Sequence, residues 1–227
     1  MSIRWLALAP RRANRARRRR QGGQGLVEFA MLVPVFLLIL LGMLEFGFAF
    51  NHNLTLQYAT REGARAGAAA ADGTLKDSSC VDPVSASPRP FGPADVDPLV
   101  IAAVQRVLKS PGSMVDVAQV TDVRIYKVSN NGSDIGPVNI WPRTIGTGAN
   151  VPCVSPAQKM DFSAPSSTPW LASDRNNGAA PDSIGVSITY TYQFRSALGS
   201  ILRFFGGAGA SSLTMTDRTV MALEPTP

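Results

Sequence analysis

Residues 26–50 read LVEFAMLVPVFLLILLGMLEFGFAF, and this stretch of 25 residues decides the architecture of the chain. Its uncharged centre, residues 29–44, is 16 residues long, and the acids Glu28 and Glu45 flank it. A bilayer core of about 30 Å requires about 20 helical residues, so the stretch spans a membrane if both carboxylates lie near its surfaces. A soluble core helix would carry a polar face at 3.6-residue spacing, whereas this stretch is apolar all round. The sequence therefore predicts a transmembrane helix over residues 24–50.

Positive charge is concentrated ahead of this helix. The first 20 residues contain eight of the chain's 22 basic residues and no acidic one, so the remainder carries 14 basic against 16 acidic residues. Arginine-rich flanks are retained on the cytoplasmic side of a membrane. We therefore expect residues 1–23 to form a basic cytoplasmic leader, and residues 51–227 to lie outside the cytoplasmic (inner) membrane of a single-pass protein whose immediate partner is membrane lipid.

Two other interpretations of the basic leader fit less well. A cleaved secretory signal has an apolar core of 7 to 15 residues followed directly by a small-residue site. Here the nearest such site, around residues 66–70, lies far beyond the apolar stretch. An arginine run can also bind nucleic acid, but no interleaved aromatic residues or binding fold accompany it, so no nucleic-acid partner is expected.

The junction between leader and helix reads Gln-Gly-Gly-Gln-Gly-Leu-Val-Glu-Phe over residues 21–29. An ionisable residue at the start of a membrane span is costly and therefore a functional hypothesis by default. A cut between Gly23 and Gln24 would make Glu28 the fifth residue of the new chain, and its carboxylate could pair with the α-amine of a neighbouring subunit. The simpler interpretation is that Glu28 is a boundary residue whose side chain reaches the interface.

Several elements recur in order over residues 23–70: Gly23-Gln24 before Val-Glu-Phe-Ala, Pro34, the Gly-x-x-Glu-Phe-Gly of residues 42–47, and the Arg-Glu-Gly-Ala-Arg of residues 61–65. Together they resemble the N-terminal signature of TadE-like proteins of the Tad (Flp) pilus machinery. The resemblance implies cleavage by a prepilin peptidase after Gly23. It also implies a pilin-type acidic and aromatic pair at Glu28 and Phe29, and a role as a minor pseudopilin or assembly component that enters the pilus after processing. The partners would be other pilins or pseudopilins and Tad platform proteins.

Two alternatives to this function remain. The chain could be an uncleaved single-pass anchor whose extracytoplasmic binding domain braces the pilus or envelope assembly. It could also be a membrane-tethered binding module unrelated to pili.

The outer end of the membrane helix carries the second acid. Glu45 lies 17 residues after Glu28, about 25 Å along a helix, and so just inside the outer interface. Its carboxylate either reaches the interface or pairs with a neighbouring subunit inside the membrane. Residues 51–71 continue the helix as a predicted stalk, in which Gly63 and Gly67 have the spacing that allows close approach of a partner backbone, or mark fraying before a linker.

Residues 72–227 are predicted to form an extracytoplasmic α+β domain, a small antiparallel sheet with one packed helix. Asp97 and Pro98 favour a helix start that continues to about Lys109. Alternation predicts strands over residues 115–129, 186–194 and 213–223, and residues 130–183 read mostly as loop. The apolar face of Leu198, Ile201, Leu202 and Phe205 fits a core helix better than a patch that touches the membrane or a subunit.

No catalytic site is predicted. His52 is the only histidine and shares no motif with a nucleophile, while the glycines form no phosphate-binding loop. Cys80 and Cys153 have no zinc-site spacing, so no metal, cofactor or small-molecule substrate is expected. Both cysteines follow the membrane helix, where a disulfide is allowed and would contribute about 4 kcal/mol by closing a loop of about 70 residues. Two buried thiols are the alternative.

Overall fold

The structure, a computed structural model, describes residues 13–73, 79–129 and 135–224, with side chains described from Gly23 onward except at positions 79, 135, 208 and 210. Residues 1–12 of the predicted leader lie outside this part. The helices are α1 (Ala13–Ala70), α2 (Pro93–Leu108) and α3 (Ala197–Gly206), with 3-10 turns η1 (Val117–Gln119), η2 (Ala172–Asp174) and η3 (Ala208–Ser211). The strands are β1 (Ser79–Val81), β2 (Pro88–Pro90), β3 (Val120–Val128), β4 (Ile135–Pro142), β5 (Ser183–Gln193) and β6 (Ser212–Ala222).

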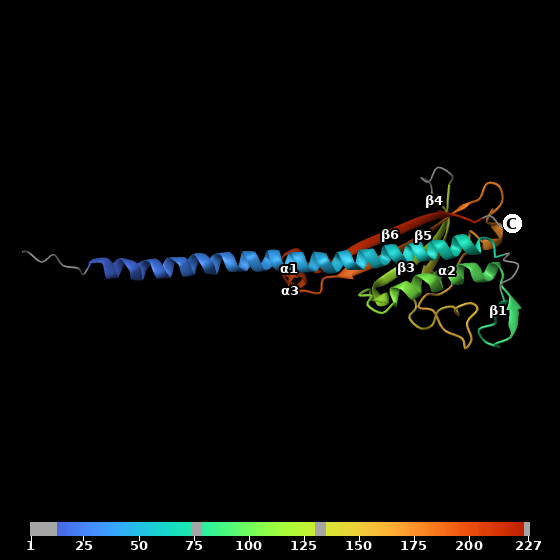
Figure 1. Cartoon of the computed structure of the whole chain (residues 1–227), viewed down its shortest axis with the longest axis horizontal. Helices are drawn as coiled ribbons and strands as arrows, with labels where there is room; N and C mark the ends of the chain where they lie inside the picture. The colour runs from blue at the N-terminus through green and yellow to red at the C-terminus, as the bar shows by residue number, and fades with distance from the viewer. Residues whose placement is uncertain (1–12, 74–78, 130–134, 225–227) are drawn as a thin grey trace, which may run out of the picture.

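Helix α1 is a continuous rod of 58 residues, and the domain gathers around its C-terminal half (Figure 1). Its N-terminal half projects away from the domain, and the most apolar window of 18 residues within 23–70 is entirely unburied. Among the described residues this is the one helix long and apolar enough to cross a membrane. A large apolar surface without protein cover is stable only in an apolar solvent, so this half of α1 fits a membrane span.

The domain is built on a four-stranded antiparallel sheet with the order β4-β3-β5-β6. The alternation predicted for residues 186–194 is present in β5, where Val186, Ile188, Tyr190 and Tyr192 are fully buried on one face. The α+β class and the antiparallel sheet predicted from the sequence are thereby confirmed.

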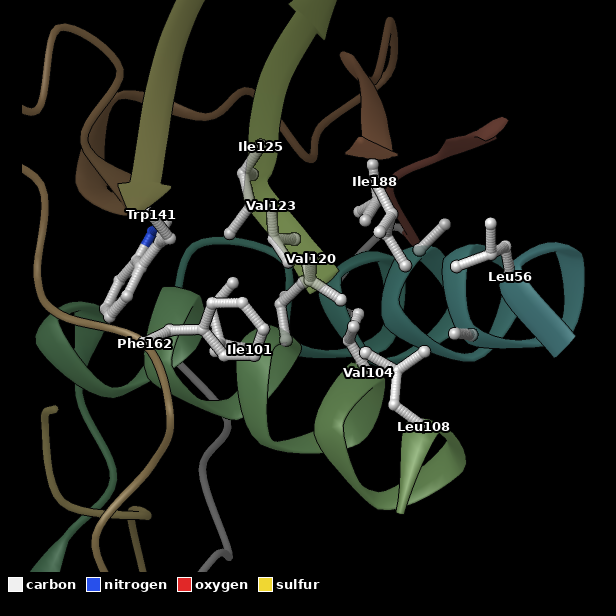
Figure 2. Packing of buried hydrophobic residues seen from close by; sticks show 14 of the residues in the cluster. Leu56, Ile101, Val104, Leu108, Val120, Val123, Ile125, Trp141, Phe162 and Ile188 are labelled. Carbon is white, nitrogen blue, oxygen red and sulfur yellow. The ribbon is translucent and has the colours of Figure 1, made fainter. Parts of the chain in front are cut away.

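The C-terminal half of α1 lies on the same face of the sheet as α2. Figure 2 shows Ile101 and Val104 of α2 near Val120 of β3, and Leu56 of α1 belongs to the same cluster. Small residues of α1 also contribute to this core: Ala59, Ala64 and Ala68. The segment 51–71, which the sequence assigned to a stalk outside the domain, is helical but forms part of the domain's core.

The glycines of α1 explain how closely these helices pack. A Cβ atom on Gly63 would lie 2.6 Å from Cγ2 of Val104, and one on Gly67 would lie 2.5 Å from Cδ1 of Ile184. The Gly-x-x-x-Gly spacing therefore serves close approach, as one interpretation held, but the neighbours belong to the same chain.

Helix α2 begins earlier than its sequence suggests. Its N-cap is Gly92, whose N–H donates to the Asp95 carboxylate at 3.1 Å, and Pro98 lies inside the helix. Asp97 is not the N-cap but a buried acceptor: Asn139 Nδ2 donates to it at 2.8 Å, and the Arg175 guanidinium donates to its other oxygen. The predicted start was wrong because an Asp-Pro pair also fits the second turn of a helix. There the Asp97 side chain accepts hydrogen bonds from Asn139 and Arg175 and does not cap the helix.

Strand β4 was missed in the segment predicted to be mostly loop. It contains Gly136, Pro137 and Pro142, which weaken a strand prediction. Proline is nevertheless tolerated at the edge of a sheet, where its missing N–H is not required for pairing, and β4 is an edge strand. Beyond it, residues 143–182 are largely irregular, as expected.

A smaller apolar cluster closes the end of the domain farthest from the projecting half of α1. It joins Ala70, Phe91 and Val96 to the cysteine pair. The sulfur atoms of Cys80 and Cys153 are 2.08 Å apart, so the structure contains the disulfide rather than two thiols.

We predict that Gly67→Val lowers the free energy of unfolding by about 1–3 kcal/mol, the usual cost of overpacking. The new side chain would displace Ile184 and Val100, whose Cγ2 lies 3.0 Å from the Cβ position. Thermal unfolding in detergent, followed by circular dichroism, measures this. Gly47→Val is the matched control, because the same helix leaves open space around Gly47; equal effects of both changes would contradict the packing argument.

Candidate functional site

The inner end of α1 holds the residues that the sequence assigned to processing. Gly23, Gln24, Glu28 and Phe29 are all exposed on the projecting half of the helix. Gln24 Nε2 donates to Glu28 Oε1 at 3.1 Å, one turn along the helix. The peptide bond between Gly23 and Gln24 lies inside continuous helix, so a protease would have to unwind this turn to reach it.

The outer end of the projecting half holds a different arrangement around Glu45. Its side chain is only 3% exposed, although the next residue, Phe46, is 73% exposed. The backbone N–H of Arg195 donates to Glu45 Oε1 at 2.8 Å, and the backbone N–H of Ser196 donates to Oε2 at 2.9 Å. The Tyr192 hydroxyl also donates to Oε1.

These three donors come from one corner of the domain, where β5 ends and α3 begins. Ser196 is the N-cap of α3 and accepts a hydrogen bond from the Leu198 N–H at 3.2 Å. A carboxylate that accepts several hydrogen bonds can remain charged in an apolar setting. Glu45 therefore anchors this corner to α1, and the predicted alternatives, reaching the interface or pairing with a neighbouring subunit, are replaced by a contact within the chain.

A chain of buried polar groups extends from Glu45 into the core. The ring of Tyr192 meets the His52 imidazole edge-on, with ring centroids 5.0 Å apart. His52 Nδ1 lies 3.0 Å from the Tyr190 hydroxyl, and that hydroxyl donates to Gln119 Oε1 at 2.7 Å. The order of contacts is thus Glu45, Tyr192, His52, Tyr190 and Gln119. The contacts alternate between α1 and β5 and end at η1.

The hydrogen bonds assign the histidine tautomer. A tyrosine hydroxyl carries one proton, and Tyr190 gives it to Gln119, so His52 Nδ1 must donate to the Tyr190 oxygen. His52 is fully buried, and its Nε2 is a buried nitrogen without a hydrogen-bond partner among the described residues. The imidazole is therefore enclosed by the core of the domain.

The electrostatics of the tyrosines follow from burial. Burial raises the pKa of Tyr192 well above its usual range, and the hydrogen bond to Glu45 raises it further, because the hydroxyl proton is held by a carboxylate. Burial likewise raises the pKa of Tyr190. Both phenols therefore stay neutral donors at physiological pH.

Glu45 and the alternation of β5 are both visible in the sequence, but their contact is not. Tyr192 falls within the strand predicted over residues 186–194, and Ser196 lies between that strand and the apolar face that begins at Leu198. The sequence does contain a signal for this contact. Tyr190 and Tyr192 follow each other on one face of the predicted strand, and buried tyrosine hydroxyls require polar partners in the core. Glu45 and His52 could supply them because, seven residues apart, they lie on the same face of α1.

Among the described residues, no cluster of three or more histidine, cysteine, aspartate or glutamate side chains could hold a metal ion. A hollow of about 590 Å³ lies between α2 and the loop around Val154, and apolar side chains together with Arg106 and Lys109 contribute to its lining.

Residues 23–65 match a family model described as TadE-like protein. The chain carries a TadE-like segment. No curated protein and no solved structure matches it. The TadE-like segment begins at the predicted cleavage site, includes Glu28, Glu45 and His52, and ends within the part of α1 that packs against α2 and the sheet. It thus covers both the exposed acid and the anchored acid of α1.

We predict that Glu45→Gln destabilises the domain by about 1.5–3 kcal/mol, the usual contribution of hydrogen bonds to a charged group. Glutamine keeps the size of the side chain but replaces one acceptor oxygen by a donor, which faces other donors. Unfolding in detergent measures the loss, and hydrogen exchange should quicken at the amides of Arg195 and Ser196.

Glu62→Gln is the control for this change. Glu62 pairs with Arg65 at 2.8 Å on the outside of the same helix, and such exposed pairs contribute about 0–1 kcal/mol. Unchanged exchange at Arg195 and Ser196 in the Glu45 variant would show that the carboxylate does not hold this corner.

Proposed function

We propose that this chain is a minor pseudopilin or assembly component of a Tad (Flp)-type pilus. The TadE-like match over residues 23–65 supports a pilus-related role. In this proposal a prepilin peptidase removes the leader between Gly23 and Gln24, and the projecting half of α1 then packs against the corresponding helices of other pilins or pseudopilins. The chain acts by helix packing and carries out no reaction.

The observation that carries the proposal is the exposure of Glu28 on an otherwise apolar half-helix. Its neighbours Val27 and Phe29 are 56% and 67% exposed, so no part of the domain covers this surface. A carboxylate on a lipid-facing helix requires a cation to offset its desolvation. The α-amine that cleavage would create on Gln24 of a neighbouring subunit is such a cation.

The charge pattern supports the direction of insertion. The arginines of the leader lie before the apolar stretch and the domain follows it, which by the positive-inside rule supports a cytoplasmic N-terminus and a domain outside. The disulfide between Cys80 and Cys153 fits an oxidising compartment on the domain's side.

One observation favours the alternative of an uncleaved anchor. Helix α1 starts at Ala13 and runs through Gly23 without a break, so the intact chain has a regular helix at the proposed cut. An uncleaved chain would remain in the membrane by the projecting half of α1 and present its domain to the envelope or to the pilus base.

Mass spectrometry of the membrane-extracted protein tests the cleavage. We expect the mature chain to begin at Gln24, and Gly23→Leu to leave the leader in place because the side chain obstructs entry of the backbone into the protease. Gly42→Leu, at a position with open space around it, should be processed normally. A chain that retains Met1 in a cell with an active prepilin peptidase would contradict the pseudopilin mechanism.

Glu28→Gln tests the pairing with a neighbouring amine. We expect the variant to insert and fold normally, but co-purification with partner pilins should fall about ten- to hundredfold, the equivalent of about 1.5–3 kcal/mol for a charged hydrogen bond. Quantitative pull-down from detergent-solubilised membranes measures this.

Glu28→Asp, which keeps the charge, should retain a larger share of the binding than Glu28→Gln. Wild-type co-purification and pilus assembly in the glutamine variant would refute the electrostatic pairing and leave the anchor function.

A further inference from the structure

Helix α3 presents an apolar surface that no part of the described domain covers. Phe204 and Phe205 are 84% and 82% exposed, with ring centroids 5.2 Å apart. Leu198, Ile201 and Leu202 are only partly buried and lie outside the main core. The prediction that these residues form a core helix was therefore wrong, because α3 packs beside α1 at the edge of the domain rather than on the sheet.

The position of α3 along α1 is fixed by the hydrogen bonds of Glu45. The N–H of Ser196, the N-cap of α3, donates to that carboxylate at 2.9 Å. Figure 1 shows α3 beside α1 at the end of the domain nearest the projecting half of the rod. The uncovered stretch before this point, residues 23–44, is about 33 Å long as a helix and so matches a bilayer core of about 30 Å.

We propose that α3 is a membrane-interface helix that inserts Phe204 and Phe205 into the outer leaflet beside α1. This inference rests on the proposed insertion of the projecting half of α1 into the membrane, but not on cleavage of the leader. It assigns a lipid surface to a helix outside the TadE-like segment, and it makes the chain a protein with two lipid contacts, one spanning and one lying along the interface.

Composition supports a lipid surface as the partner of α3. Interfacial helices combine bulky apolar residues on one face with basic residues on the other, and α3 has Arg203 beside its two phenylalanines. A second aromatic pair, Phe46 and Phe50, is 73% and 55% exposed on α1 just beyond Glu45, with stacked rings 6.4 Å apart. Exposed aromatic residues of both helices thus occur close to the level at which a bilayer around residues 23–44 would end.

A second protein fits this surface less well. A helix of ten residues is about 15 Å long, and its apolar face alone is too small for the roughly 1,200–2,000 Å² buried in a stable protein interface. The lipid-facing surface of α1, in contrast, is continuous with it, because α3 contacts α1 at the outer end of the projecting half.

The interface contact has a structural consequence. Helix α1 alone would leave the domain free to tilt and to rise or sink in the membrane. A second lipid contact, tied to α1 through Glu45, fixes the depth of the span and the orientation of the sheet. Extraction of the subunit into a filament would then require withdrawal of both helices from lipid.

Photo-crosslinking of the full-length protein in vesicles of phosphatidylethanolamine and phosphatidylglycerol tests this inference. Benzoylphenylalanine replaces one residue at a time: Phe204 in α3, Phe36 in the projecting half of α1, and Val84, which is 78% exposed in the turn between β1 and β2. We expect lipid adducts at positions 204 and 36, detected by mass spectrometry, and no lipid adduct at position 84.

A companion experiment places the photoreactive residue at Ser200, within α3. The double change Phe204→Gln with Phe205→Gln should abolish lipid adducts at this position, whereas Phe204→Leu with Phe205→Leu should preserve them. In both variants the adduct at position 36 should be unchanged, which shows that the chain still spans the membrane.

The outcomes separate the proposals. Adducts at position 36 without adducts at position 204, or cross-links from position 204 to a second protein chain in place of lipid, would overturn the interface helix while leaving the membrane span intact. Absence of lipid adducts at position 36 would refute the span and the interface helix together.

Discussion

The Glu45 carboxylate is the constraint on which the arrangement of the protein depends. It lies where α1 leaves its uncovered half and enters the domain, and it accepts hydrogen bonds from Tyr192, Arg195 and Ser196. An unpaired carboxylate at this depth would be costly, so the end of β5 and the start of α3 must remain against α1. Since α1 has no break at this point, the direction of the span also sets the direction of the sheet.

The two acids of the apolar stretch show how one residue type can serve opposite purposes. Both lie at the edges of the same uncharged segment, but Glu45 is buried by its own domain, whereas Glu28 is exposed. An acid whose hydrogen-bonding capacity is met within the chain stabilises the subunit. Glu28, which is exposed and accepts a hydrogen bond from Gln24, is not held by the domain in this way.

Much of the fold could be predicted from local pattern. The length of the apolar stretch predicted the membrane span, and the alternation of residues 186–194 predicted β5. Both predictions were possible because each signal lies within one segment. Strand β4 was missed because its prolines are tolerated only by virtue of its edge position. The start of α2 was misplaced because the partners of Asp97, namely Asn139 and Arg175, are 42 and 78 residues away. The exposure of α3 could not be predicted, since the same apolar face suits a core or a lipid surface.

The candidate site illustrates the same limit in its chemistry. Both ends of the contact were visible: an acid near the end of the span and tyrosines on the buried face of a strand. Their meeting is a long-range event, separated by 147 residues for Glu45 and Tyr192. Only the shared requirement for polar partners in an apolar setting links them, and that requirement does not specify which partner is chosen.

Side-chain size along α1 provides the remaining link between the helix and its two surroundings. In the uncovered half the bulky residues Leu32, Phe36 and Leu40 face outward, where lipid can conform to any surface. In the half that carries the domain, Gly63, Ala64 and Gly67 face a fixed surface formed by α2 and β5, which admits only small residues. The alanine- and glycine-rich composition that suggested a free stalk is therefore what allows this half to be buried. Along the buried face of α1 the small residues begin at Ala59, after Leu56 and well beyond Glu45, where the helix already packs against α2 and the sheet.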